Sequence, residues 1–276
     1  MKKSGVFYEL IRIFQLVRIK TSIIAFIITG GISVYNYHYT INALILGLTV
    51  LSTISFGYSI NEYCDHKKDI LMPGDHLIPS GLMTRKQVLI ISCCFFSVSL
   101  LLTTLLSSFQ QVLNIILLFI LSVYSYINNK NGIIANILVA TCSGLGILLT
   151  LRNFEWSITS YTCIAFFLHI LGREIILDIH DYEADRAMGK NSFPILFTIH
   201  RSFLIAILLS MGCIIYAAIV GFYFMRYSYV LFIFLGNAVF LFGVLNYWSS
   251  TAENEYKKFV LYSRISFLLV IPAFFF

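Results

Sequence analysis

Acidic residues are concentrated in two short stretches of this 276-residue chain, because nine of its 13 Asp and Glu residues lie in segments 61–75 and 173–190. In the first segment, Asn61, Asp65 and Asp69 recur every four residues. A helix that continues through this segment would stack the three side chains on a single face. The spacing therefore predicts a row of oxygen ligands at the end of a helix.

The second segment carries a longer row of the same kind. Glu174, Asp178, Asp181 and Asp185 follow one another at i, i+4, i+7 and i+11. If the segment is one continuous helix, these four carboxylates also share a face.

Carboxylates repeated along one helix face repel each other unless a cation lies among them. Mg²⁺ is typically held by a few carboxylates together with substrate phosphates. We therefore predict that the two segments bind one diphosphate through Mg²⁺, and we set aside ordinary solvated helix ends because so many of the acids gather in two places. The predicted metal ligands are Asn61, Asp65, Asp69, Asp178, Asp181 and Asp185.

The elements that carry these residues belong to a membrane protein. The chain is 59% hydrophobic and only 12% charged, whereas a soluble domain is about a quarter charged. No stretch is long or polar enough for a separate soluble domain, so residues 1–276 are predicted to form a single transmembrane domain. The fold is predicted to be an all-α bundle, because a helix satisfies its own backbone hydrogen bonds in lipid. A helix of roughly 20 apolar residues is long enough to cross the hydrocarbon core.

Nine transmembrane helices are predicted, as two four-helix halves and a ninth helix. Their expected ranges are 17–37, 41–63, 87–107, 111–128, 133–151, 157–180, 201–222, 228–248 and 258–276.

The basic residues set the predicted orientation. With nine spans and the N-terminus inside, 17 of the 19 Lys and Arg residues fall on one side, and only Arg152 and Arg226 on the other. The positive-inside rule makes the rich side cytoplasmic, together with the N-terminus and both acidic segments. The net charge of +6 then reflects topology and contact with membrane lipid, and no nucleic-acid partner is expected.

Residues 1–20 contain no predicted cleavable signal peptide, since no small-residue cleavage site follows the next apolar run. The cysteines show no Cys-x-x-Cys spacing and are predicted to be small buried hydrophobes without disulfides. They are Cys64, Cys93, Cys94, Cys142, Cys163 and Cys213.

On these residues the chain resembles the UbiA superfamily of intramembrane prenyltransferases. Asn61, Asp65 and Asp69 match its first motif, and Asp181 and Asp185 match its second. The segments 78–81, 124–126 and 135–136 also resemble family sequences. The stretch 173–185 is similar to the branch of archaeal geranylgeranylglyceryl phosphate prenyltransferases and their bacterial relatives.

The resemblance implies a nine-helix bundle with a central cavity open to lipid, in which Mg²⁺ on the two motifs holds an allylic prenyl diphosphate. The prenyl group would ionise and pass to an aromatic or lipid acceptor. The implied catalytic residues are Asp65, Asp69, Asp181 and Asp185. The implied substrate-binding residues are Asn61, Arg18, Lys68, Lys130, Tyr126, Asn136, Arg173 and Lys190.

Several positions depart from the family pattern. His76 stands where the family has Arg before the Pro-Ser-Gly turn, Asn129 where it has Lys, and Glu62 where it has Asp. Fewer fixed cations would then face the diphosphate, and the candidate substitutes are Lys67, Lys68, Lys130, Arg173 and Lys190. Arg173 is also expected to pair with Glu174 or Asp178, and Lys190 fits a solvated loop equally well.

Two other functions compete with prenyl transfer. A UbiA-type terpene cyclase would let a double bond of the same prenyl chain attack the cation, and the altered basic positions keep this alternative open beside prenyl transfer. A cation transporter or lipid-binding protein would use the acids without catalysis. Transport predicts helices broken by Gly or Pro at the midplane, and none of the four prolines lies near the centre of a span.

Overall fold

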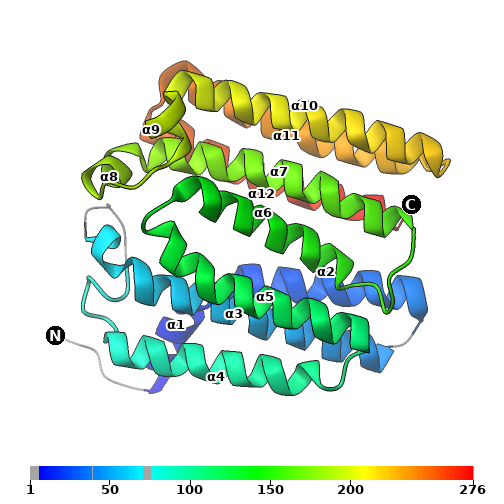
Figure 1. Ribbon diagram of the computed structural model, residues 1–276, viewed down its shortest axis with the longest axis horizontal. Coiled ribbons are helices and arrows are strands. Elements are labelled where there is room, and N and C mark those ends of the chain that lie inside the picture. Colours follow the sequence, from blue (N-terminus) through cyan, green and yellow to red (C-terminus); the bar gives the residue numbers. More distant parts are fainter. Residues whose placement is uncertain (1–5, 39, 71–75, 276) are drawn as a thin grey trace. The chain divides into compact units, whose positions relative to one another are not determined.

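The computed structural model describes residues 6–38, 40–70 and 76–275, without the side chains of residues 6, 7, 67 and 68. Apart from one isolated bridge, all regular secondary structure in the described residues is helical. The chain divides into two compact units, Met1–Asn129 and Lys130–Phe276. Figure 1 shows the helices of both units in sequence colours.

The first unit is organised around one long helix. Helix α3 packs against α2, α4 and α5, and it carries the first acidic motif. The helices of this unit are α1 (Val6–Leu16), α2 (Ile19–Tyr37), α3 (Thr40–Asp69), α4 (Arg85–Thr103) and α5 (Ser108–Asn128).

In the second unit, the second acidic segment runs from the end of α7 onto the short helix that follows it. Helix α7 packs against α6 and α10, while α11 packs against α10 and α12. The long helices of this unit are α6 (Gly132–Leu148), α7 (Ile158–His180), α10 (Ile199–Tyr223), α11 (Tyr227–Ser250) and α12 (Glu253–Val270). Its short helices are α8 (Tyr182–Ala187), α9 (Phe193–Phe197) and the 3₁₀ helix η1 (Ile271–Phe274).

Every one of the nine predicted ranges overlaps a long helix, and the two units divide between the fourth and the fifth of them. Within the described residues, six helices are long and apolar enough to cross a membrane: α2, α3, α4, α5, α10 and α11. Helix α6 is shorter, and α7 and α12 carry charged residues. The all-α, multi-pass membrane architecture is thus confirmed, whereas nine spans and a lipid-open central cavity remain predictions.

Large apolar side chains are exposed along the candidate spans, including Leu101 on α4, Phe119 on α5 and Ile219 on α10. In water such a surface would favour aggregation. In a bilayer it is the surface expected to contact lipid tails, as the composition predicts.

Each unit encloses a polar network around a buried asparagine. In the first unit, Asn114 on α5 donates to Ser99 and Thr103 on α4 at 3.0 and 2.7 Å and accepts from Thr53 on α3 at 2.9 Å. These bonds join three helices. Inside a bilayer, apolar contact alone hardly favours packing of one helix on another over packing on lipid, so the polar bonds specify the partners.

In the second unit, Asn237 on α11 accepts from Ser210 on α10 at 2.9 Å. His169 on α7 lies 3.2 Å from Asn237 Oδ1 and 3.1 Å from Ser266 on α12. His169 is therefore a satisfied buried histidine, and the network ties four helices together.

The helix bounds differ from the predicted ones at two important places. Helix α3 continues to Asp69, beyond the expected end at residue 63. A break at Arg18, whose φ is 45°, separates α1 from α2. Helix α7 ends at His180, as the range 157–180 predicts, and α8 begins at Tyr182, so the four acids of the second segment do not lie on one continuous helix.

The cysteine prediction was correct on pairing and partly wrong on burial. All six cysteines are free. Cys93 and Cys94 are exposed on α4 and only Cys213 is fully buried, because α4 turns most of its apolar surface outward.

Candidate active site

The first motif lies on the last three turns of α3, which stays helical through Asp69 as the four-residue spacing predicts. Asp65 is buried with 7% of its surface exposed. Asn128, the last residue of α5, donates its side-chain amide to Asp65 Oδ2 at 3.3 Å. The carboxylate is thus oriented by a neighbouring helix of the same unit.

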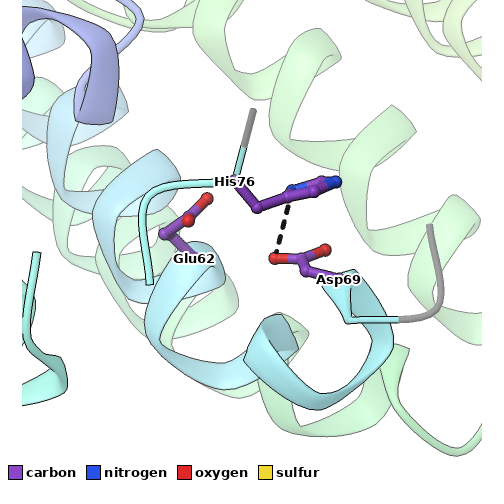
Figure 2. A group of neighbouring side chains, drawn as sticks. All are labelled: Glu62, Asp69 and His76. Atoms are coloured by element: carbon purple, nitrogen blue, oxygen red, sulfur yellow. Dashed lines mark ion pairs between the residues drawn. The ribbon is translucent and has the colours of Figure 1, made fainter. Parts of the chain in front are cut away.

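Glu62 fixes the described part of the loop between α3 and α4 that begins at His76. Its Oε1 accepts the backbone N–H groups of Leu77 at 2.9 Å and Ile78 at 3.4 Å. This anchor returns the loop to the helix, and His76 Nδ1 then lies 3.4 Å from Asp69 Oδ2. Figure 2 shows Glu62 and Asp69 on α3 and the imidazole of His76 lying over Asp69.

The same loop is held by a small apolar cluster. Leu77 and Met83 are buried with Leu16 at the end of α1 and Val88 on α4. Gly81 closes the turn with φ of +68°, a conformation that costs glycine little. The loop is thereby fixed on one side by Glu62 and on the other by apolar packing.

Arg18 lies next to the helix that carries the motif. Its guanidinium carbon sits 4.8 Å from the centre of the Tyr58 ring on α3, one turn before Asn61 and Glu62. The exposed Arg18 side chain is a cation–π partner of that ring, and it remains a candidate for binding a phosphate.

The other positions of the first unit that the sequence singled out are Lys67, Lys68, Tyr126 and Asn129. The side chain of Lys68 is outside the described residues, as is that of Lys67. Tyr126 is 64% exposed on α5. Asn129, at the position of the expected lysine, donates to the backbone oxygens of Ser125 and Cys64 at 3.2 and 3.5 Å.

In the second unit, a buried lysine joins two aspartates. Lys190 Nζ lies 3.2 Å from Asp185 Oδ2 and 3.8 Å from Asp178 Oδ1. Asn136 on α6 donates to Asp178 Oδ2 at 2.7 Å. We call Asn136, Asp178, Asp185 and Lys190 the lysine cluster. Lys190 is 4% exposed and is therefore not a solvated loop residue.

Main-chain bonds hold Lys190 in this position. Asn191 pairs with the start of α6, since its N–H donates to Lys130 O at 3.2 Å and its carbonyl accepts from Gly132 N at 2.7 Å. A Cβ atom at Gly132 would come within 2.8 Å of Lys190 Cε. The glycine at 132 therefore makes room for the lysine stem.

Asp181 is separate from the lysine cluster. It lies at the break between α7 and α8, where His180 Nδ1 is 3.1 Å from Asp181 Oδ1. The other imidazole nitrogen of His180 is 3.1 Å from Glu253 Oε2, and its ring stacks on Tyr256 at 3.6 Å. The hydrogen bond with His180 lowers the pKa of Glu253.

Accessibility differs among the three aspartates of the second motif. The Asp181 side chain is 27% exposed, against 8% for Asp178 and 0% for Asp185. Asp181 is therefore the carboxylate of this motif most open to an incoming cation, whereas Asp178 and Asp185 hold Lys190.

The two remaining basic candidates differ in how exposed they are. Arg173 donates to Glu174 at 2.6 Å and to Ser263 on α12 at 3.0 Å. The predicted pairing with Glu174 is thus confirmed. Lys130 is exposed at the entrance to α6.

The side chains at the first motif suit Mg²⁺. Hard oxygen donors are the ligands it prefers, and the amide oxygen of Asn61 is buried without a hydrogen-bond partner in the described part of the chain.

Four positioning residues were missed from the sequence: Glu62 as the loop anchor, His76 beside Asp69, Asn128 on Asp65 and His180 on Asp181. His76 and His180 carried a signal, because each is a histidine close in sequence to a motif aspartate.

Comparison with known proteins adds independent information. The chain is 24% identical to the digeranylgeranylglyceryl phosphate synthase of Methanosphaera stadtmanae over 266 residues, which are 94% of this chain and 96% of that one. A structure of digeranylgeranylglyceryl phosphate synthase superposes with a TM-score of 0.74 at 21% identity and 96% coverage of both chains.

A UbiA homologue from Archaeoglobus fulgidus, solved with GPP and Mg²⁺, superposes with a TM-score of 0.73 at 17% identity, covering 95% of this chain and 98% of that one. These structures share the fold. The model of the UbiA prenyltransferase family matches residues 22–269. The chain therefore belongs to the UbiA prenyltransferase family, whose enzymes transfer prenyl groups.

Proposed function

We propose that this protein ionises an allylic prenyl diphosphate in the presence of Mg²⁺ and transfers the prenyl group to a lipophilic acceptor within the membrane. The observation that carries the proposal is the continuation of α3 through Asp69, which aligns Asn61, Asp65 and Asp69 as oxygen ligands. Family membership and the solved homologue with GPP and Mg²⁺ support the same reaction.

A lipid alcohol is the acceptor that we propose to test first. The relatives that match over most of their length are named digeranylgeranylglyceryl phosphate synthases. We therefore propose a prenylated glyceryl phosphate as the first acceptor to test, and an aromatic acceptor as the alternative.

The carboxylates divide into two roles in this proposal. Asp65 and Asp69 with Asn61, and Asp181 of the second motif, bind the metal. Bound Mg²⁺ would neutralise the negative charge that develops on the leaving diphosphate.

The basic residues Lys190 and Arg18 also have different roles in this proposal. Lys190, with its single positive charge, offsets part of the negative charge of Asp178 and Asp185 and holds the two carboxylates together. Arg18 contributes an exposed positive charge for the diphosphate. We propose that both acidic segments and the N-terminus lie on the cytoplasmic side, and that residues 1–276 act as one transmembrane domain.

Product analysis on the purified chain tests the proposal. The detergent-solubilised protein is incubated with Mg²⁺ and C10 to C20 prenyl diphosphates, with and without acceptors, and the products are weighed. We expect a product with the mass of prenyl plus acceptor. Hydrocarbon formed without acceptor would instead identify a cyclase, and no turnover with any donor would contradict both enzymes.

Variants connect the reaction to the motifs. Asp65→Ala or Asp181→Ala should abolish turnover while the protein still elutes as a folded species. Glu9→Gln is the matched control, because Glu9 is a half-exposed acid on α1 whose ion pair among the described residues is with Arg12. Full activity in either aspartate variant would refute the proposed metal-binding role of that motif.

A further inference from the structure

The first motif includes an imidazole that an all-oxygen Mg²⁺ site does not explain. One ligand atom from each of Glu62, Asp69 and His76 lies within 4.8 Å of the other two. Figure 2 shows the two carboxylates and the imidazole converging from α3 and the following loop. Ligands around one metal ion at about 2.1 Å are about 3 to 4 Å apart, so a small movement would let all three bind one ion.

Glu62 retains an oxygen for such an ion. Its Oε1 already accepts the N–H groups of Leu77 and Ile78. Oε2 accepts no hydrogen bond from the residues that the structure describes. One carboxylate thus both fixes the loop that carries His76 and offers a ligand beside it.

A second, separate observation points to a ligand at the same turn of α3. The amide oxygen of Asn61, adjacent to Glu62 in the chain, is buried without a hydrogen-bond partner from the described residues. A buried polar oxygen without a partner is costly, and a bound cation would relieve that cost.

We propose that His76 is a metal ligand, and that Glu62, Asp69 and His76 together bind a divalent cation of the Mn²⁺ class more tightly than they bind Mg²⁺. Imidazole nitrogen suits transition metals, whereas Mg²⁺ strongly prefers oxygen. This inference rests on the proposed function in one respect, since Asp69 also belongs to the motif assigned to the diphosphate metal.

Mn²⁺ binding to the full-length protein tests the proposal without turnover. Binding is followed by loss of the free Mn²⁺ electron paramagnetic resonance signal, and ¹⁴N coupling to the bound ion is measured by pulsed methods. We expect ¹⁴N coupling of a coordinated imidazole in the unmodified protein. His76→Asn should remove that coupling and weaken Mn²⁺ binding by at least about tenfold. Even the loss of a residue that only hydrogen-bonds to a metal ligand lowers metal affinity by about 10- to 100-fold.

Two further variants distinguish ligation from folding. Glu62→Gln keeps the Oε1 acceptor for the loop but removes the charge, and it should weaken Mn²⁺ binding while the protein stays folded. His66→Asn, on α3 beside Asp65, should leave the ¹⁴N coupling unchanged.

Coupling that persists in His76→Asn, or disappears in His66→Asn, would overturn the assignment. An unchanged ratio of Mn²⁺ to Mg²⁺ affinity in His76→Asn would also overturn it. The prenyl-transfer assay reports the proposed function separately, because turnover with Mg²⁺ is expected whether or not His76 is a ligand.

Discussion

The ammonium group of Lys190 lies 3.2 Å from the carboxylate of Asp185, and both side chains are almost fully buried. Removing one partner of a buried ion pair leaves an uncompensated charge and costs about 3–5 kcal/mol. We expect Lys190→Met to lower the free energy of unfolding by about that amount, as measured by thermal or denaturant unfolding in detergent.

The control for that substitution is Lys257→Met. Lys257 is 69% exposed and pairs with Glu253 at 3.6 Å, and an exposed pair contributes about 0–1 kcal/mol. The double variant Lys190→Met with Asp185→Asn should recover part of the lost stability. If Lys190→Met is no more destabilising than Lys257→Met, the lysine cluster does not support the fold.

Gly132→Ala tests the space reserved for the lysine stem. The added Cβ would lie 2.8 Å from Lys190 Cε and 3.1 Å from Ser192 Cβ, and such overpacking typically costs about 1–3 kcal/mol. We expect reduced stability and reduced turnover, measured on the same preparation.

Gly146→Ala on the same helix is its matched control. A Cβ at Gly146 meets nothing within 4 Å, and alanine favours a helix over glycine by up to about 1 kcal/mol. This variant should be as stable as the unmodified protein or slightly more so. Equal effects of the two substitutions would show that space beside Lys190 is not limiting.

Arg18→Gly separates the charge of Arg18 from its backbone. Because residue 18 has φ of 45°, glycine fits there without strain. If the guanidinium binds the diphosphate, its loss should raise KM for the prenyl diphosphate by about tenfold, which corresponds to about 1.4 kcal/mol, with little change in stability. Arg12→Gln, which removes a basic residue paired with Glu9, should leave KM unchanged.

Labelling of introduced cysteines tests the orientation in the membrane. In a variant without the six native cysteines, Glu155→Cys should react with a membrane-impermeant maleimide on intact cells. Ala252→Cys should react only after permeabilisation, because the positive-inside rule places its connection in the cytoplasm. The reverse pattern would invert the topology, and labelling of both sites on intact cells would contradict the predicted spans between them.

Sequence spacing was sufficient for the parts of the molecule governed by helix geometry. The four-residue interval of Asn61, Asp65 and Asp69 fits one helix face, and α3 does continue through all three residues, past the predicted end of the span at residue 63. Each of the nine predicted apolar ranges overlaps a long helix in the described part of the chain. The predicted range 157–180 ends where α7 ends, whereas the short helix α8 after Asp181 was not predicted.

Long-range contacts explain what the sequence left undecided. Lys190 fits a solvated loop until Asn191 is known to pair with the chain some sixty residues earlier. Likewise, His76 lies beside Asp69 in a segment whose backbone donates to Glu62. Neither contact has a local signature, since both depend on segments that meet only in the folded unit.

The pairing of Asn191 with the start of α6 uses main-chain atoms alone. A side chain exchanged at position 191 therefore leaves those two hydrogen bonds in place, and with them the path of the neighbouring lysine. The location of this positive charge is thus set by the course of the backbone: any residue with a backbone N–H can make the two bonds at position 191, whereas a Cβ at Gly132 would meet the lysine stem.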